Sequence, residues 1–343
     1  MENKGFALLH IPGEDANLFH YFKGVWEQKS FFNVPFLGDG RRCVFGEWGQ
    51  NEHYWQLADT EYQHLAKAEL RKISPEIRKK TERIESTDFA VFAKEITEIQ
   101  QELRNGQIQK MVASRTISME LELNESDTIN WFLKLSEVFP QSLVYVHSSP
   151  IFGTWIGASP ETLCNYSQGT CTLMSLAGTL FSEDEMWSAK EEAEQSITAK
   201  YIHEVINKYS EKIEIKPLTE LQNGSIRHLL QQFQFELVKN KFGAFVEDLQ
   251  PTPAVAGYPK IESIKWLNEN SMVKRELYAG FLGLIDEDKA FLNVNLRCAQ
   301  ITDKQVVFYA GCGINLGSKS EREWQETQLK SEVISEYLKI IRE

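Results

Sequence analysis

A glycine-rich stretch near the end of the chain, residues 308–330, constrains the fold most. It begins in a short apolar segment, 306–310, whose composition is typical of a strand, and then reaches Gly-Cys-Gly at 311–313, where we expect a turn. Because glycine has no Cβ, the backbone can approach a ligand closely there, and its N–H groups can face an anion. The stretch therefore predicts an anion-binding site at the end of a strand.

A helix predicted from Ser320 onwards places charged side chains on its inner face. Glu323 and Glu326 are three residues apart and share one face, which continues through Lys330 and Val333. Two carboxylates and a lysine that point inward need partners, and a hard cation together with an anionic substrate would supply them. The residues also allow a simpler interpretation, in which Ser320 and Glu323 form a capping box at the helix start.

The spacing of the glycines argues against a nucleotide-binding loop. A phosphate-binding P-loop has four residues between its glycines, followed directly by Gly-Lys-Ser/Thr. Here three residues separate Gly313 from Gly317, and Ser318 precedes Lys319. The P-loop pattern is therefore not met.

A second predicted helix, 188–209, also opens with a pair of glutamates. Glu194 falls on the apolar stripe that continues through Ile197 and Tyr201, and Glu191 lies one turn earlier. Acidic residues in a first helical turn favour the helix dipole, but the dipole does not explain why Glu194 lies on the apolar stripe. Two such helices could hold one Mg²⁺ ion together, because oxygen ligands without a His or Cys cluster favour Mg²⁺ over zinc.

Three further charged residues lie in or beside apolar segments. Lys110 opens an alternating strand, 109–117, and is either a solvated edge lysine or, if buried, a base with a lowered pKa. Glu161 follows a Ser-Pro turn at a strand start, where a surface position is the simpler expectation. Arg297 interrupts an apolar strand predicted at 291–301, and a buried arginine favours a carboxylate in bidentate geometry.

The first 85 residues carry little recognisable chemistry. They contain short strand-like segments and a segment, 61–70, that we expect to be helical. The histidines of this part lack the i, i+4 pairing of a zinc-binding helix, so we expect surface or core roles for them: they are His10, His20, His53 and His64. Towards the other end of the chain, 276–283 is predicted to be a tight apolar strand.

The composition limits the class of protein and its partners. The 343 residues are 42% apolar and 25% charged, which is typical of a soluble globular protein. The net charge of −12 argues against nucleic acid or an anionic membrane as partner. Five cysteines without Cys-x-x-Cys spacing indicate a reducing compartment. With no signal-like N-terminus and no membrane-spanning stretch, we expect a cytoplasmic location.

The chain resembles the chorismate-binding enzymes, the family of isochorismate, salicylate, anthranilate and aminodeoxychorismate synthases. The matching motifs occur in family order over about 100–343, whereas the N-terminal third matches poorly. They are Lys110-Met-Val-Ala-Ser-Arg115, Gly157-Ala-Ser-Pro-Glu161, Leu176-Ala-Gly-Thr179, Lys190-Glu-Glu-Ala-Glu194, His228-Leu229, Pro251-Thr-Pro-Ala-Val-Ala-Gly257, Tyr278-Ala-Gly280, Arg297, Ala310-Gly-Cys-Gly-Ile314 and Glu323-Trp-Gln-Glu-Thr-Gln-Leu-Lys330.

The resemblance implies an α+β fold like that of anthranilate synthase component I, with two large antiparallel sheets packed together and helices outside. It implies a single chorismate-binding domain over 1–343, with a variable N-terminal region at 1–95 and the catalytic core at 96–343. The site would be a cleft that holds Mg²⁺ and chorismate.

The resemblance also assigns roles to individual residues. Glu194 and Glu323 would bind the metal directly, with Glu191 and Glu326 around them. Substrate would be held by Arg297, Lys330, Tyr278 and the backbone of Gly311 and Gly313, with Thr179 and His228 lining the site.

The resemblance further favours isochorismate synthase among the family's activities. Members that add ammonia carry glutamine where this chain has Lys110, so Lys110 implies a base that activates water and no glutaminase subunit. Ala177 replaces the nucleophilic lysine of the aminodeoxychorismate enzymes. Glu161 would then be the acid that protonates the departing C4 hydroxyl. The product would feed menaquinone or siderophore biosynthesis. We also expect a monomer, because the sequence shows no coiled-coil pattern.

Salicylate synthase is the alternative within the family. Those enzymes also form isochorismate but then eliminate pyruvate, and they carry a threonine-like residue where this chain has Ala254. The chain departs from the family pattern at Gln250, where most members have histidine.

Overall fold

The computed structural model describes residues 3–31, 37–38, 40–50, 52–182, 184–223 and 226–340. The helices of these ranges are α1 (Lys67–Leu70), α2 (Phe89–Arg104), α3 (Glu125–Val138), α4 (Ala189–Ile206), α5 (Phe242–Leu249), α6 (Lys260–Asn270) and α7 (Ser320–Ile340). The strands are β1 (Lys4–His10), β2 (Leu18–Ser30), β3 (Arg42–Gly46), β4 (His53–Ala66), β5 (Lys110–Glu120), β6 (Leu143–Ser149), β7 (Gly153–Ser159), β8 (Thr162–Ser167), β9 (Thr170–Leu180), β10 (Ile213–Ile215), β11 (Thr219–Asn223), β12 (Ile226–Glu236), β13 (Gly257–Tyr258), β14 (Phe281–Ile285), β15 (Lys289–Val294), β16 (Cys298–Ile301) and β17 (Gln305–Ile314).

These strands form one continuous antiparallel network that folds back on itself. In the first half, the paired order is β13, β5, β17, β16, β7, β6 and β1. The second half runs β3, β14, β15, β8, β9 and β12, with β10 and β11 on β12. The long strands β2 and β4 join the two halves, because β2 pairs with β1 and β4 pairs with β3.

The two halves pack face to face through the largest apolar cluster. Tyr145 of β6 and Trp155 of β7 share this cluster with Leu282 of β14, Leu292 of β15 and Phe233 of β12. The close contacts include an edge-on pair between Phe45 of β3 and Tyr145. The expected α+β fold with two packed antiparallel sheets is thus confirmed, although hydrogen bonds connect the sheets.

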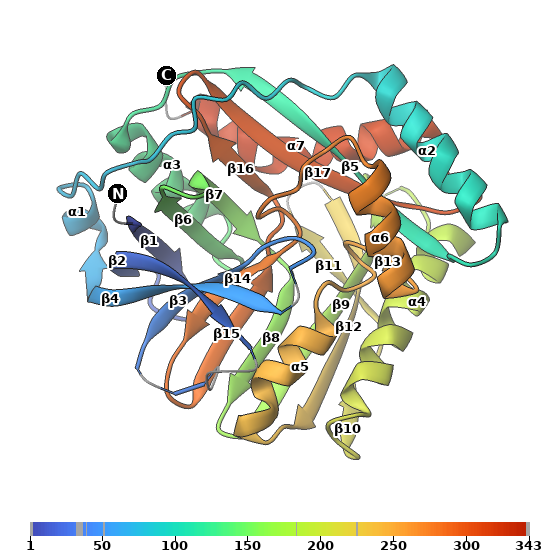
Figure 1. The fold of residues 1–343 in the computed structure, drawn as a ribbon, viewed down its shortest axis with the longest axis horizontal. Helices are drawn as coiled ribbons and strands as arrows, with labels where there is room; N and C mark the ends of the chain where they lie inside the picture. The colour runs from blue at the N-terminus through green and yellow to red at the C-terminus, as the bar shows by residue number, and fades with distance from the viewer. Residues whose placement is uncertain are drawn as a thin grey trace.

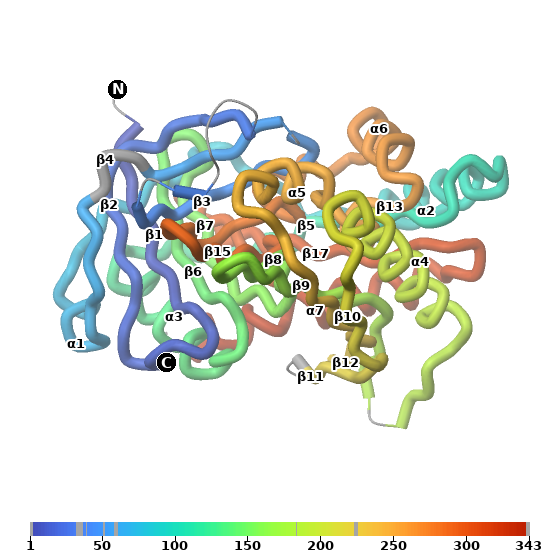
Figure 2. Tube along the Cα trace, turned by 90° about the horizontal axis from the view of Figure 1, so that it is seen from below, coloured from blue at the N-terminus to red at the C-terminus, as the bar shows by residue number. Residues whose placement is uncertain are grey.

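Helices cover the outside of this core. Helices α3 and α7 pack on the outer face of the first half, where Phe132 and Ile334 meet Val146 and Phe308. Helices α4 and α5 add Ile202 and other apolar side chains to the second half. Figures 1 and 2 show α2, α4 and α6 on one side of the molecule and β2 and β4 on the opposite side.

Two short crossovers between the two halves lie next to each other. One crossover, Pro160–Glu161, joins β7 to β8, and the other, residues 295–297, joins β15 to β16. The crossovers are hydrogen-bonded on both sides: Ala158 N donates to Arg297 O at 3.0 Å, and Val294 N donates to Glu161 O at 3.0 Å. Glu161 and Arg297 are therefore held together although they are far apart in sequence.

The structure corrects four sequence-based expectations. Residues 61–66 continue β4, so only Lys67–Leu70 is helical in the segment expected to form a helix. Residues 276–280 form a turn, in which Glu276 and Ala279 have φ of 47° and 63°, and the strand begins at Phe281. The strand predicted over 291–301 is broken at Arg297, whose φ is 48°.

The fourth correction concerns the glycines at 311–313. They do not form a turn but continue β17, where Gly311 pairs with Ser114 and Gly313 with Val112. Their role is therefore close packing rather than chain reversal, since neither has a positive φ. All five cysteines are buried and free. Among the described helices, none combines the length and the apolar character needed to cross a membrane.

Candidate active site

A cavity lies where the two halves of the sheet meet the helices. The first half contributes Lys110 from β5 and Gly311 and Gly313 from β17, and the second half contributes Thr179 and His228 from β9 and β12. The remaining predicted residues at its wall are Glu161, Arg297, Tyr278, Glu194, Glu326 and Lys330.

Lys110 is buried at the start of β5, with 1% of its surface exposed. The short strand β13 pairs with β5 at this point, Tyr258 against Lys110, so the lysine does not lie on an open sheet edge. Burial lowers the pKa of Lys110, and the nearest ion-pair partner is Glu194, whose Oε2 lies 3.9 Å from Nζ. The solvated-edge alternative is therefore excluded, and the lysine is biased towards its neutral form.

Glu161 is the buried counterpart of Lys110 in the same cavity. The crossover between β7 and β8 carries it inward, and 3% of its surface is exposed, so the expected surface position is wrong. Burial raises the pKa of Glu161 to about 8, against the opposing effect of the Lys110, Lys330 and Arg297 charges. At neutral pH this carboxyl group is therefore largely protonated and can donate a proton.

Glu194 of α4 and Glu323 of α7 approach each other through a shared lysine. Lys190 Nζ lies 2.5 Å from Glu323 Oε1 and 3.8 Å from Glu194 Oε1. Burial raises the pKa of both carboxyl groups, that of Glu194 to about 7. The second oxygen of Glu323, Oε2, is buried and makes no hydrogen bond to the described residues. Glu323 therefore does not cap its own helix but faces α4.

Glu326 lies one turn further along α7 and is paired with Lys330. Lys330 Nζ donates to Glu326 Oε1 at 2.6 Å and to the carbonyl oxygen of Gly311 at 3.0 Å. Burial acts to raise the pKa of Glu326, but the charges of Lys330 and Lys190 outweigh it and lower that pKa. The carboxylate of Glu326 thus remains ionised at the wall of the cavity.

Glu191 is placed differently from the other three glutamates. Its carboxylate accepts hydrogen bonds from the backbone N–H and the hydroxyl group of Ser188, so it forms the capping box of α4. Its other oxygen lies 3.9 Å from Arg322 Nη2. The capping interpretation considered for Glu323 therefore applies to Glu191, which lies behind the cavity wall.

Arg297 and His228 form a fixed hydrogen-bonded pair. His228 Nδ1 lies 2.8 Å from Gly178 O and therefore carries the proton, which leaves Nε2 to accept from Arg297 Nη2 at 3.1 Å. Burial, followed by the charge of Arg297, lowers the pKa of His228 to about 3, so the ring stays neutral. In the described part of the chain Arg297 makes no ion pair, so its charge is available to an anion.

The glycines of β17 leave room for the side chains opposite them. A Cβ on Gly313 would lie 2.3 Å from Glu194 Oε2, and one on Gly311 would lie 2.7 Å from the hydroxyl oxygen of Tyr278. Any larger residue would displace one of these groups. Both glycines thus lie at the cavity wall, in a strand and not in the expected turn.

Two residues of the site received no individual role from the sequence. Lys190 bridges the carboxylates, and its position four residues before Glu194 is the signal that could have indicated it. Arg115 of β5 anchors α7, because its Nε donates to Thr327 Oγ1 at 2.7 Å and its guanidinium lies 3.6 Å from the ring centre of Trp324.

The family model described as "Chorismate binding enzyme" matches residues 44–339, which include every residue of the cavity discussed above. The chain belongs to the chorismate-binding enzymes. This match confirms the resemblance carried by the motifs between Lys110 and Lys330.

Relatives of this chorismate-binding enzyme include isochorismate synthases. A chloroplastic isochorismate synthase of Catharanthus roseus is 30% identical over 211 residues, which are 57% of this chain and 35% of that protein. The salicylate biosynthesis isochorismate synthase of Pseudomonas aeruginosa is 28% identical over 253 residues, which are 70% of this chain and 52% of that protein. The chain thus spans about half of these relatives or less.

Solved structures share the fold of this chorismate-binding enzyme. DhbC from Bacillus anthracis superposes with a TM-score of 0.80 at 19% identity, over 97% of this chain and 96% of that one. MenF from Escherichia coli gives a TM-score of 0.78 at 18% identity, over 98% and 89% of the two chains. Anthranilate synthase component I from Streptococcus pneumoniae gives 0.69 at 19% identity, over 88% and 81%.

Proposed function

We propose that this chain is a Mg²⁺-dependent isochorismate synthase, which converts chorismate to isochorismate. The observation that carries the proposal is the pair formed by Lys110 and Glu161 in one cavity. Burial lowers the pKa of the lysine and raises that of the glutamate to about 8, so both are biased towards their neutral forms. A neutral amine and a neutral carboxylic acid are the groups that general base and general acid catalysis require.

In the proposed reaction, Lys110 removes a proton from water while the oxygen of that water forms a bond to C2 of chorismate. The ring double bonds shift, the bond between C4 and its hydroxyl oxygen breaks, and Glu161 gives its proton to the departing hydroxyl group, which leaves as water. One water enters and one leaves, so the reaction is an isomerisation. The proton passes from Lys110 back to Glu161 through solvent between turnovers.

The basic groups of the cavity support binding of a dicarboxylate. Arg297 is 7% exposed, has no carboxylate partner in the described residues and is held in place by His228. Lys330 lies beside Gly311, which has no side chain to block the approach of the substrate. We assign the substrate carboxylates to these groups, with Tyr278 and Thr179 at the wall of the same cavity.

The carboxylates fit a divalent cation of the Mg²⁺ type. Glu194 and Glu323 face each other across Lys190, and Glu323 Oε2 is buried with no hydrogen bond to the described residues. Oxygen ligands of this kind suit Mg²⁺, which keeps several waters and takes few carboxylates. We propose Glu194 and Glu323 as direct ligands, with Glu326 and Glu191 around them. A bound Mg²⁺ would neutralise and orient the C1 carboxylate of the substrate.

We also propose that the chain works as a monomer and needs no glutaminase subunit. The support for the second point is chemical: Lys110 activates water, so the reaction consumes no ammonia. Size-exclusion chromatography with light scattering tests the first point, and turnover by the purified chain without glutamine tests the second.

The decisive experiment is incubation of the purified chain with chorismate and Mg²⁺, with and without EDTA, followed by chromatographic separation of the products. We expect isochorismate without salicylate, and no conversion in EDTA. Salicylate with pyruvate would instead support the salicylate synthase alternative, and would show that Ala254 at the cavity wall does not exclude elimination. Conversion that persists in EDTA would overturn the proposed role of Mg²⁺.

A further inference from the structure

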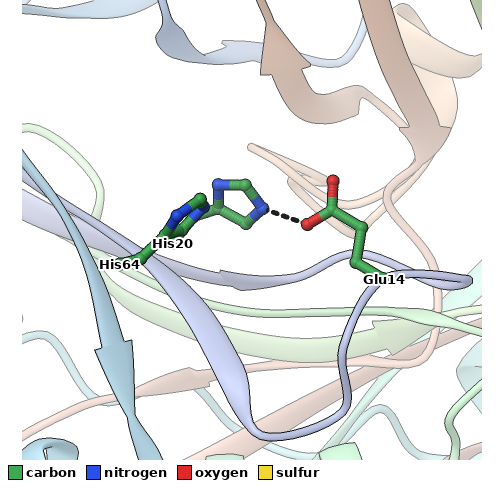
Figure 3. Close-up of side chains that lie close together, drawn as sticks. All are labelled: Glu14, His20 and His64. Carbon is green, nitrogen blue, oxygen red and sulfur yellow. Dashed lines mark hydrogen bonds and ion pairs between the residues drawn. The ribbon is translucent and has the colours of Figure 1, made fainter.

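A second group of metal-ligating side chains lies far from the cavity, on β2 and β4. His20 of β2 and His64 of β4 stand directly opposite each other in the strand pairing, so both rings project from the same face. Their ring centres are 4.6 Å apart. Glu14, from the turn after β1, reaches the same place, with Oε2 2.6 Å from His20 Nε2. Figure 3 shows Glu14 and His20 pointing towards one another with His64 beside them.

These three residues provide the ligands that zinc and its neighbours prefer. One donor atom from each lies within 4.8 Å of the others. Two imidazole nitrogens and one carboxylate form a ligand set of zinc sites, whereas Mg²⁺ favours oxygen ligands alone. Glu14 and His64 are exposed, so an ion can enter from solvent and keep a water as its fourth ligand.

We propose that Glu14, His20 and His64 form a binding site for a divalent transition-metal ion of the Zn²⁺ class. The ion takes the place of the hydrogen that Glu14 and His20 share between them. The absence of i, i+4 histidines in the sequence does not argue against this site, because its ligands come from two strands and a turn.

Neighbouring side chains already hold one ligand in the required orientation. The hydroxyl oxygen of Tyr62 lies 3.0 Å from His20 Nδ1 and 2.6 Å from His64 Nε2. A hydrogen bond to Nδ1 leaves Nε2 of His20 directed at Glu14, which is the arrangement that outer partners impose on metal-bound histidines. Arg41 also contacts Tyr62, but its positive charge is balanced by Asp286 at 2.7 Å.

The site is separate from the proposed chemistry. None of its three ligands lines the cavity, and β2 and β4 lie on the side of the molecule opposite to α2 and α4 (Figures 1 and 2). A bound ion would link the turn after β1 to β4. The inference therefore does not depend on the proposed isochorismate synthase activity.

The test is a calorimetric titration of the full chain with Zn²⁺ in excess Mg²⁺, so that the carboxylates of the cavity are saturated. We expect one Zn²⁺ per chain, and at least ~10-fold weaker binding in His64→Ala and in Glu14→Gln. Both replaced side chains are exposed, so the variants retain the core. His53→Ala, which removes a histidine of the same strand, is the matched control and is expected to bind as the unaltered chain does.

A second variant tests the site without removing a ligand. Tyr62→Phe deletes the hydroxyl group that orients His20, and we expect Zn²⁺ binding weakened by about 10-fold. The visible absorption of Co²⁺ in the same proteins reports coordination by nitrogen. The proposal is overturned if the unaltered chain binds no Zn²⁺, or if His64→Ala and Glu14→Gln bind it as the unaltered chain does. Glu14 and His20 are then a hydrogen-bonded pair only.

Discussion

Lys190 and Glu323 form the shortest link between the two acidic helices, with Nζ and Oε1 2.5 Å apart. Although burial opposes it, the charges of Glu323, Glu326 and Glu194 raise the pKa of Lys190. The ammonium group is thus a built-in counter-charge for the proposed metal ligands. A divalent cation at these glutamates would share this role with it or take it over.

Replacing Lys190 with methionine is expected to destabilise the metal-free chain by about 3 kcal/mol, because buried carboxylates then lose their counter-charge. Mg²⁺ is expected to raise the melting temperature of Lys190→Met more than that of the unaltered chain. Thermal unfolding in EDTA and in Mg²⁺ measures both effects. Lys200→Met is the matched control, since Lys200 and Glu204 form an i, i+4 pair on the same helix but are exposed. Its effect is expected to stay within about 0.5 kcal/mol, and equal effects of the two substitutions would contradict the assignment.

The pH dependence of turnover tests the acid and base roles. Activity is expected to fall as pH increases through about 8, where Glu161 loses its proton. Because burial lowers the pKa of Lys110, its neutral form is reached at a lower pH than for an exposed lysine. Lys110→Met and Glu161→Gln are each expected to lower kcat by about 10²–10⁴. The measurement is kcat/KM against pH at saturating Mg²⁺. A profile that stays flat between pH 7 and 9 is incompatible with Glu161 as the acid.

Glu161 also makes stability depend on pH. Its pKa is raised from 4.5 to about 8, so its contribution to stability is complete below about pH 4.5 and is lost as pH rises through about 8. In that window the loss approaches about 1.4 kcal/mol per pH unit. Glu161→Gln removes it, so the variant gains stability relative to the unaltered chain with rising pH. Urea unfolding from pH 5 to 8 measures this difference, and the exposed Glu122→Gln is expected to show no such trend.

Gly313 tests whether Glu194 needs the space that glycine leaves. Gly313→Ala places a Cβ 2.3 Å from Glu194 Oε2, so the carboxylate must move. We expect Mg²⁺ binding weakened by at least ~10-fold and a stability cost of about 1–3 kcal/mol. Titration calorimetry with Mg²⁺ measures the first effect. In Gly317→Ala the new Cβ lies 3.5 Å from its nearest neighbour, so this control is expected to bind Mg²⁺ normally; a normal Gly313→Ala would show that Glu194 is not a ligand.

Arg115 is expected to act as a positioning residue for α7. Arg115→Met removes the hydrogen bonds to Thr327 and Gln328, at a cost of about 2–4 kcal/mol for a buried charged donor. Because α7 carries Glu323, Glu326 and Lys330, Mg²⁺ binding is expected to weaken as well. Unfolding and calorimetry measure the two effects, and Arg83→Met, an exposed arginine, is the control. Loss of stability with unchanged Mg²⁺ affinity would restrict Arg115 to a purely structural role.

The sequence predicted the acidic helices because their geometry is local. Helical periodicity alone places Glu194 and Glu323 on inward faces, and the structure buries both. By the same local logic Ser188 and Glu191 could have been predicted as a capping box, which the structure shows. That box removes Glu191 from the cavity wall.

The sequence could not predict burial that arises from distant segments. Lys110 is covered by β13, which lies about 150 residues later in the chain. Glu161 enters the cavity because its crossover pairs with the one that ends at Arg297. Both residues were assigned roles by family resemblance, whereas their own neighbourhoods in sequence favoured the surface. The break at Arg297 and the turn at 276–280 were missed for another reason, since a positive φ in a non-glycine residue leaves no signal in the sequence.

Strands β2 and β4 connect the two halves of the strand network, and both halves contribute residues to the cavity. The residues that line the cavity come from both halves and from the two short crossovers, whereas the described residues of β2 and β4 contribute none. The side chains of β2 and β4 can therefore differ widely, provided that the length and pairing of these strands keep the two halves in the same relative orientation. A metal ion at Glu14, His20 and His64 would tie the turn after β1 to the paired strands β2 and β4, and so would brace the connection between the two halves from outside the cavity.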